Sequence, residues 1–557
     1  MPDAGPPGRV RSLVSRFAAM AAARPGFALA AATALLLVPG LGTVEVAKRE
    51  EARIGQVARE MAWSGDLLLP RLQGEPRLTK PPVPYWLAWL SFQATGRATP
   101  FTLRLPFALC GALLVLATYR FSREVHGPLA GALAGFFLLS MAFYFKMERR
   151  ATIDGLLALA VVLAVWTFHR GWARGRRDPL SRAAFFAALA LGILVKGPVV
   201  LVFVLPAAIA CVLAAPSRAP AAVADLAWGI PLFFALALPW YAYLAAEAEG
   251  SGVFEAEILT RIGLQDPEEG RIVGTHSEPF WHYLPRLPEL LAPWIVFLPL
   301  AVWAAKDRRA WSYLAWIAVP VLVLSCFAGK KTYYLFPLVP AYASLLALGI
   351  ARLAEAPAWV RKLARWTSWV VAAAVVAAGL ALPFLRFVPF RKNALLDASL
   401  PGLVFVALAL AATGWFYVRG LLAGRLVPLF PAVAAAILCL VVFRVWFEPL
   451  EDDRESASAL ARAVHSISGD GPILAYHYHV QPATLFYLPR PVENVVTHDR
   501  LRSYVGCSPR AYCLIDPGRI QELPPDVRSS CRVVLDASAV PRVTSDERQV
   551  VLLELPE

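Results

Sequence analysis

Long apolar runs recur along most of the chain and constrain its fold more than any other feature. Each run holds about 18–22 residues, which is the length that an α-helix needs to cross a bilayer. Of the 557 residues, 58% are hydrophobic and only 17% are charged, less charge than a soluble protein carries. The sequence predicts a polytopic α-helical membrane protein with about thirteen transmembrane helices, centred near residues 34, 112, 138, 161, 188, 205, 234, 295, 319, 343, 377, 409 and 435.

Short basic loops predict the orientation of these helices. Arginine and lysine mark cytoplasmic loops, and they gather in the N-terminus, RGWARGRRDPLSR (170–182), KDRR (306–309) and RKLAR (361–365). With an odd number of spans, the C-terminus and the loops 44–100 and 246–285 then lie outside, which is the periplasm of a bacterial cell. We expect the first run, 26–43, to be an uncleaved helix of this multi-pass inner-membrane protein, because further spans follow it.

The tail of the chain is polar and differs from the rest. Alternating apolar residues in PILAYHYHV (472–480) and RVVLDA (532–537) predict strands, and SASALARAVHSI (456–467) predicts an amphipathic helix. We therefore expect a transmembrane part, 1–449, and a small periplasmic α/β domain, 450–557. No motif in this domain indicates its function.

The net charge of +14 does not indicate nucleic-acid binding, because no basic soluble domain with interleaved aromatic residues is present. Basic cytoplasmic loops and anionic membrane lipids explain the charge better. We expect a monomer.

Histidines and cysteines give little sign of a metal site. His477 and His479 are expected on one strand face, but neither they nor His276 have the further ligands that a metal needs. The tail has three cysteines, so at most one disulfide can form within it. They are Cys507, Cys513 and Cys531.

Charged residues collect at the predicted outer ends of the spans, where they are costly unless they face a cavity or a partner. They are Glu50, Glu51, Arg53, Lys80, Asp154, Lys196, Arg261, Lys330 and Lys331. Together they suggest a site for an anionic, lipid-bearing substrate. Each charge also has a simpler explanation. Glu50 and Glu51 could stabilise the N-terminus of a helix by interacting with its dipole. Asp154 could be a helix N-cap, and Lys196 could extend to the membrane interface.

The stretch EEARIGQVAREMAWSGD, 50–66, predicts an amphipathic helix in the first outer loop. Glu50 heads its apolar face, whereas Gln56 and Arg59 point away from it. The apolar face consists of Ile54, Val57, Ala58 and Met61.

Several blocks resemble the membrane glycosyltransferases of the C-type superfamily. The resemblance is closest to the lipid A aminoarabinose transferase family and the protein O-mannosyltransferase-like families (glycosyltransferase families 39 and 83). The blocks that carry it are EEARIGQVAREMAWSGDLLLPRLQGEPRLTKPPVPYWL (50–87), ATID (151–154), LGILVKG (191–197), EILTRI (257–262), PFWHYLP (279–285) and GKKTYYLFPLVPAYA (329–343).

The resemblance implies a periplasmic active site and a polyprenyl-phosphate-linked sugar as donor. It assigns catalytic roles to Glu50, Glu51 and Asp154, with Glu50 standing where the family usually has Asp. It assigns donor phosphate binding to Lys80, Arg53, Arg261, Tyr334 and Lys196. Relatives commonly have Glu before the loop lysine, whereas this chain has Thr79, so a divalent metal is doubtful.

These residue types suit glycosyl transfer. Attack at the anomeric carbon expels polyprenyl phosphate, whose charge arginine and lysine stabilise. Glu50 would be the base for a hydroxyl acceptor, or would position an amino sugar if the acceptor is a lipid phosphate. The sequence thus predicts transfer of a sugar to an envelope acceptor such as lipid A, a glycan or a protein. The alternatives are a transporter or flippase for lipid-linked sugars, and a non-catalytic scaffold.

Overall fold

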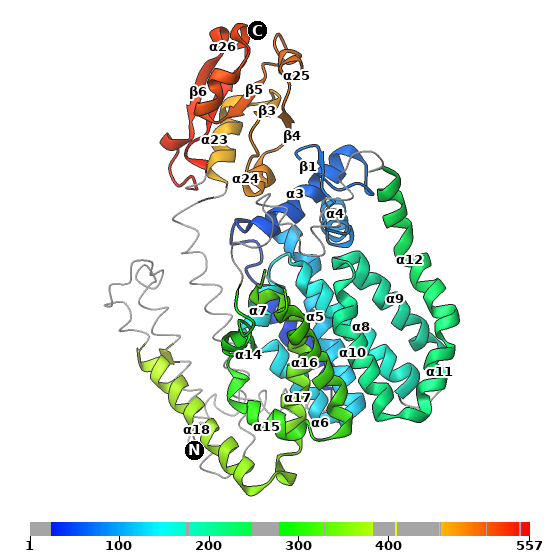
Figure 1. Cartoon of the computed structure of the whole chain (residues 1–557). Helices are drawn as coiled ribbons and strands as arrows, with labels where there is room; N and C mark the ends of the chain where they lie inside the picture. Colours follow the sequence, from blue (N-terminus) through cyan, green and yellow to red (C-terminus); the bar gives the residue numbers. More distant parts are fainter. Residues whose placement is uncertain are drawn as a thin grey trace, which may run out of the picture.

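A helical body carries a small α/β domain, and short helices lie between the two (Figure 1). The computed structural model describes residues 24–78, 80–173, 178–247, 278–327, 329–381, 407–408, 456, 458–507, 509–544 and 547–556. All structural statements below concern these residues. The predicted boundary at residue 450, together with Arg261, His276 and Thr79, lies outside them.

The body consists of packed apolar helices. They are α2 (Pro25–Leu37), α5 (Pro100–His126), α6 (Pro128–Leu139), α7 (Ala142–Glu148), α8 (Ile153–Phe168), α9 (Pro179–Lys196), α10 (Val199–Ala214), α12 (Leu226–Glu247), α14 (Leu287–Leu291), α15 (Leu298–Ala304), α16 (Trp311–Ser325), α17 (Val339–Ala351) and α18 (Ala358–Ala381). Among the described residues, five helices are long and apolar enough to cross a membrane, or up to seven if two bent pairs each count as one span. Helices cover the predicted centres from 34 to 377, whereas 409 and 435 are not described, so the total of about thirteen stays a prediction.

The C-terminal domain is a five-stranded sheet with helices around it. The strand order is β4 (Val492–Val495), β3 (Ile473–Tyr476), β5 (Tyr512–Ile515), β7 (Val551–Glu554) and β6 (Arg532–Asp536). The first three strands are parallel, and β7 pairs antiparallel with both β5 and β6. The helices are α23 (Ala459–Ser468), α24 (Pro482–Tyr487), α25 (His498–Arg502) and α26 (Pro525–Ser530). The strands and the helix predicted for the tail are therefore confirmed.

One detail of that prediction is wrong. Strand β3 ends at Tyr476, and His477 has a positive φ of 44°, which turns the chain out of the sheet. His477 and His479 therefore do not share a strand face. Cys507, Cys513 and Cys531 are free thiols.

Helix α3 (Arg49–Ser64) is the amphipathic helix that the sequence predicts. It begins after Lys48 and ends at Gly65, whose φ of 74° suits glycine. The predicted apolar face is buried, but so is the side that carries Gln56, which is 1% exposed. This second side is buried because α24 of the C-terminal domain packs on it.

Side chains of α3 hold the C-terminal domain in place. Arg59 donates hydrogen bonds to the carbonyl of Leu485, at 2.9 Å, and to those of Phe486 and Leu488. These acceptors belong to the end of α24, where helical carbonyls lack intrahelical partners. Burial lowers the pKa of Arg59 to about 10, so the guanidinium keeps its charge at neutral pH. Just before α3, Glu45 accepts hydrogen bonds from the hydroxyls of Ser456 and Ser458.

A close contact makes this interface sensitive to one methyl group. A Cβ at Gly55 would lie 2.7 Å from ring atoms of Phe486, so Gly55→Ala forces the ring and α24 away from α3. We expect a loss of about 1–3 kcal/mol, as for other overpacked contacts, and faster proteolysis between the body and the domain. Gly329→Ala is the matched control, since nothing lies within 4 Å of that position. Unchanged proteolysis of Gly55→Ala, or equal rates for both variants, would contradict this interface.

Candidate active site

Two neighbouring acids of α3 have different environments. The side chain of Glu51 is 3% exposed, and Arg104 donates to both its oxygens, at 2.7 and 2.9 Å. The backbone N–H of Ala151 donates to the same carboxylate at 3.0 Å. Glu51 thus ties α3 to the start of α5 and to the segment before α8. This geometry favours a positioning role, and the catalytic role of Glu51 stays a prediction.

Glu50 points toward solvent instead. Its side chain is 55% exposed, and Arg53 lies 3.1 Å away as an ion-pair partner that is itself only 11% exposed. Tyr85, on α4 (Val83–Thr95), lies within electrostatic reach of both residues, and burial raises its pKa. The predicted placement of both acids in a first helical turn is confirmed.

A second acid–base pair joins two helices of the body. Lys196, the last residue of α9, donates a 2.5 Å hydrogen bond to Asp154 in the first turn of α8. The two side chains are 14% and 9% exposed, and the Lys196 ammonium lies 4.7 Å from the ring centre of Tyr334. The N-cap of α8 is Thr152, so the interpretation of Asp154 as an N-cap is wrong. Lys196 binds this acid and does not simply extend to the interface.

The two pairs lie at the same end of the body. Tyr333 and Tyr334 belong to the 3-10 helix Thr332–Leu338, which packs against α8, and both lie within electrostatic reach of Asp154 and Glu50. The fold therefore brings together Glu50, Asp154, Lys196 and Tyr334 from four distant segments. We call this set the acid–base cluster and this end of the body the α3 end.

Lys80 follows a hairpin that α3 holds. The strands β1 (Arg71–Leu72) and β2 (Glu75–Pro76) flank a turn whose backbone N–H groups, at Gln73 and Gly74, donate to Glu60 at 2.9 and 3.1 Å. Burial raises the pKa of Glu60. Lys80 is half-buried between this hairpin and α4. Glu60 thus holds in place the loop that carries Lys80, which is predicted to bind the donor phosphate.

The two lysines of the GKKTYY segment differ. Lys330 is 7% exposed and donates to the carbonyl of Glu278 at 2.7 Å, so it anchors the chain at that point, whereas Lys331 is exposed. In the described part of the chain, no three His, Cys, Asp or Glu side chains are grouped as a metal site requires.

Arg104 is the main residue of this end that belongs to none of the sequence motifs. It is 1% exposed and also donates to the carbonyls of Leu41, Val44 and Glu45. An arginine near the start of an apolar helix is a sequence signal in its own right, because such charges are rare there without a partner. Glu60 and Arg59 give no comparable signal, since charges on an amphipathic helix are ordinary.

Comparison with known proteins places this chain near a group of membrane glycosyltransferases. Residues 79–243 match the family model of dolichyl-phosphate-mannose-protein mannosyltransferases. An undecaprenyl phosphate-alpha-4-amino-4-deoxy-L-arabinose arabinosyl transferase of Sodalis glossinidius is 29% identical over 54% of this chain and 54% of its own length. A protein of the same name from Pectobacterium carotovorum is 28% identical over 60% of this chain and 61% of its own length. The chain thus matches little more than half the length of these relatives.

The likeness in structure extends further than the likeness in sequence. The crystal structure of ArnT from Cupriavidus metallidurans bound to undecaprenyl phosphate has a TM-score of 0.71 and 18% identity, and the match covers 95% of this chain and 97% of that one. Its apo state has a TM-score of 0.69. The polytopic membrane fold is therefore shared with ArnT. The predicted resemblance of this chain to the membrane glycosyltransferases of families 39 and 83 is confirmed.

Proposed function

We propose that this protein is a glycosyltransferase of the bacterial inner membrane. It transfers a sugar, with an aminoarabinose-like sugar as the first candidate, from polyprenyl phosphate to an envelope acceptor such as lipid A. The observation that carries the proposal is the acid–base cluster, in which Lys196 and Asp154 meet beside Tyr334 and near Glu50, in a chain with the ArnT fold.

Charge supports a periplasmic position for the cluster. The start of α8 and the end of α9 meet at the α3 end, so the end of α8 and the start of α9, near Arg170 and Arg182, lie at the opposite end of the body. Arg308 and Arg309, between α15 and α16, line a cavity together with His169 at that end of α8. Basic residues favour the cytoplasmic side. The α3 end, with the C-terminal domain above it, then faces the periplasm.

The cluster provides a positive charge that can stabilise a departing phosphate. Lys196 places a positive charge in a mostly buried setting, where it stabilises developing negative charge more than it would in water. Asp154 holds that ammonium in place, and the Tyr334 ring restricts it from one side. Lys80 and Arg53 are the further candidates for the phosphate oxygens, and Arg261 stays a prediction.

Glu50 is the candidate group for the acceptor. Its exposed carboxylate can accept a proton from a hydroxyl or contact the amine of an amino sugar. Arg53, at 3.1 Å, orients it. The residues do not fit a metal site, because Asp154 is bonded to a lysine and Thr79 supplies no carboxylate, so no step is routed through a metal.

Transfer by the purified protein tests the proposal. Polyprenyl-phosphate sugars are supplied with lipid A, glycan and protein acceptors, and products are identified by mass spectrometry. We expect a product with at least one donor, and a loss of about 10²–10³-fold in rate for Lys80→Ala, as for other lost charge-stabilising groups. Glu50→Gln should also lose rate if the acceptor is a hydroxyl.

Mass spectrometry of lipid A and envelope glycans from a deletion strain identifies the sugar and acceptor independently. No product with any donor, together with unchanged glycans in the deletion strain, would overturn the proposal. Flux of lipid-linked sugar across vesicles without transfer would favour the transporter instead.

A further inference from the structure

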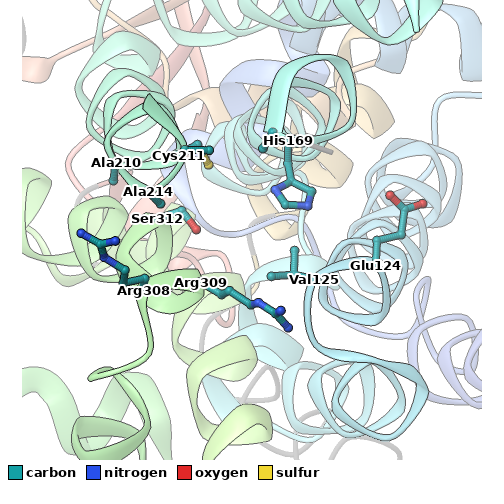
Figure 2. Close-up of a pocket in the computed structure, with 11 residues that line it drawn as sticks. Glu124, Val125, His169, Ala210, Cys211, Ala214, Arg308, Arg309 and Ser312 are labelled. Atoms are coloured by element: carbon teal, nitrogen blue, oxygen red, sulfur yellow. The ribbon is translucent and has the colours of Figure 1, made fainter. Parts of the chain in front are cut away.

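A cavity of about 410 Å³ lies at the end of the body opposite the α3 end. The C-terminal end of α5, the end of α8 with the π-helical turn His169–Ala173, the end of α10 and the junction of α15 and α16 surround it. In Figure 2, Arg308 lies below Ala210 and Ala214, Arg309 lies between Arg308 and Val125, and His169 lies across from Ser312. No residue of the acid–base cluster lines this cavity.

The charge of the lining is positive. Arg308 and Arg309 are exposed, and no carboxylate of the described residues forms an ion pair with either side chain. The guanidinium of Arg308 stacks over the Trp311 ring at 5.3 Å, which leaves its N–H edge available for hydrogen bonds. Each guanidinium offers paired N–H donors that suit the oxygens of a phosphate group.

The one acid among the described lining residues is already engaged. Glu124 accepts a hydrogen bond from the indole of Trp166 at 3.1 Å and lies 3.6 Å from Arg170 as an ion-pair partner. Asp307, next to the two arginines, pairs with Arg352 at 2.6 Å. Both carboxylates are therefore paired with other arginines, and neither neutralises the charge of Arg308 or Arg309.

The remaining wall is apolar and continues onto the lipid-facing surface of α10. Val125, Ala210, Cys211 and Ala214 line the cavity without charge. Three exposed apolar side chains form a stripe on the adjoining face of α10. They are Leu205, which is 44% exposed, Ile209, which is 57% exposed, and Leu213, which is 60% exposed. In a membrane helix such side chains contact acyl chains, so an apolar surface runs along the helix to the side of a basic cavity.

We propose that this cavity binds the phosphate head group of an anionic membrane phospholipid, with acyl chains along the exposed stripe of α10. Basic pockets between transmembrane helices on the cytoplasmic side are suited to such head groups. A free phosphate would use the two arginines but would gain nothing from the apolar stripe. The inference does not depend on the proposed transferase function, because it rests on a separate cavity.

Lipid binding by the full-length protein tests the inference. The protein is purified in detergent, incubated with phosphatidylglycerol or phosphatidylcholine, and analysed by native mass spectrometry. We expect preferential retention of phosphatidylglycerol and a loss of about thirtyfold in its binding for Arg308→Gln/Arg309→Gln, as two charges near a lipid head group are removed. Lys306→Gln is the matched control, because Lys306 is exposed on the same loop but is not among the described lining residues.

A second variant distinguishes binding in the cavity from general attraction of anionic lipid to a basic surface. Ala214→Trp fills the cavity without a change of charge and should also reduce retention of phosphatidylglycerol. The inference is overturned if Lys306→Gln loses as much lipid as the arginine variant, or if Ala214→Trp retains wild-type binding. It is also overturned if inorganic phosphate displaces the lipid at equal concentration, since the head group alone would then account for binding.

Discussion

Replacing Lys196 with methionine is expected to lower the rate of sugar transfer by about 10²–10³-fold, the usual effect of losing one preorganised charge at a reacting group. This prediction rests on the proposed function. The ammonium is mostly buried, bonded to Asp154 at 2.5 Å and placed against the Tyr334 ring. Methionine keeps the length of the side chain but supplies no positive charge to the departing phosphate. Initial rates at saturating donor and acceptor measure the effect.

The control must separate chemistry from stability, because Lys196→Met leaves the Asp154 carboxylate without its ammonium partner. In Lys196→Met/Asp154→Asn both charges are absent, so thermal stability should recover while transfer stays low. Lys331→Met removes an exposed charge from the same end and should transfer at close to the wild-type rate. Wild-type transfer by the double variant would exclude Lys196 from catalysis.

Arg104→Met is expected to destabilise the fold by about 3–5 kcal/mol, because it leaves a buried carboxylate unpaired. It also removes the donor to the carbonyls of Leu41, Val44 and Glu45. Glu51→Gln should cost less, since Arg104 keeps those three acceptors and the glutamine oxygen can still accept one hydrogen bond. Unfolding curves in one detergent compare the two variants directly.

Arg97→Met is the control for the arginine itself. Arg97 is exposed just before α5, so its loss should leave the unfolding curve close to that of the wild type. If Glu51→Gln were as destabilising as Arg104→Met, the ion pair would stabilise the fold more than the carbonyl contacts do. If neither variant shifted the curve, the proposed link between α3 and α5 would be wrong.

The sequence by itself determined the membrane fold and the local elements. Apolar runs of spanning length can only be helices, because lipid offers the backbone no hydrogen-bond partners. The heptad-like spacing of Ile54, Val57 and Met61 likewise required an amphipathic helix at α3. The order of short motifs was enough to indicate the glycosyltransferase resemblance, since each motif is local in sequence.

Only the tertiary structure decided which charges meet. Glu50 and Glu51 are adjacent and chemically equivalent in the sequence, but packing against Arg104 buries one and leaves the other at the surface. The pairing of Asp154 with Lys196 depends on α8 and α9 lying side by side, and the burial of Gln56 depends on α24, more than 400 residues away. Local pattern fixes the helix and its apolar face, whereas an ion pair or a covered polar face depends on the partner that packing brings to it.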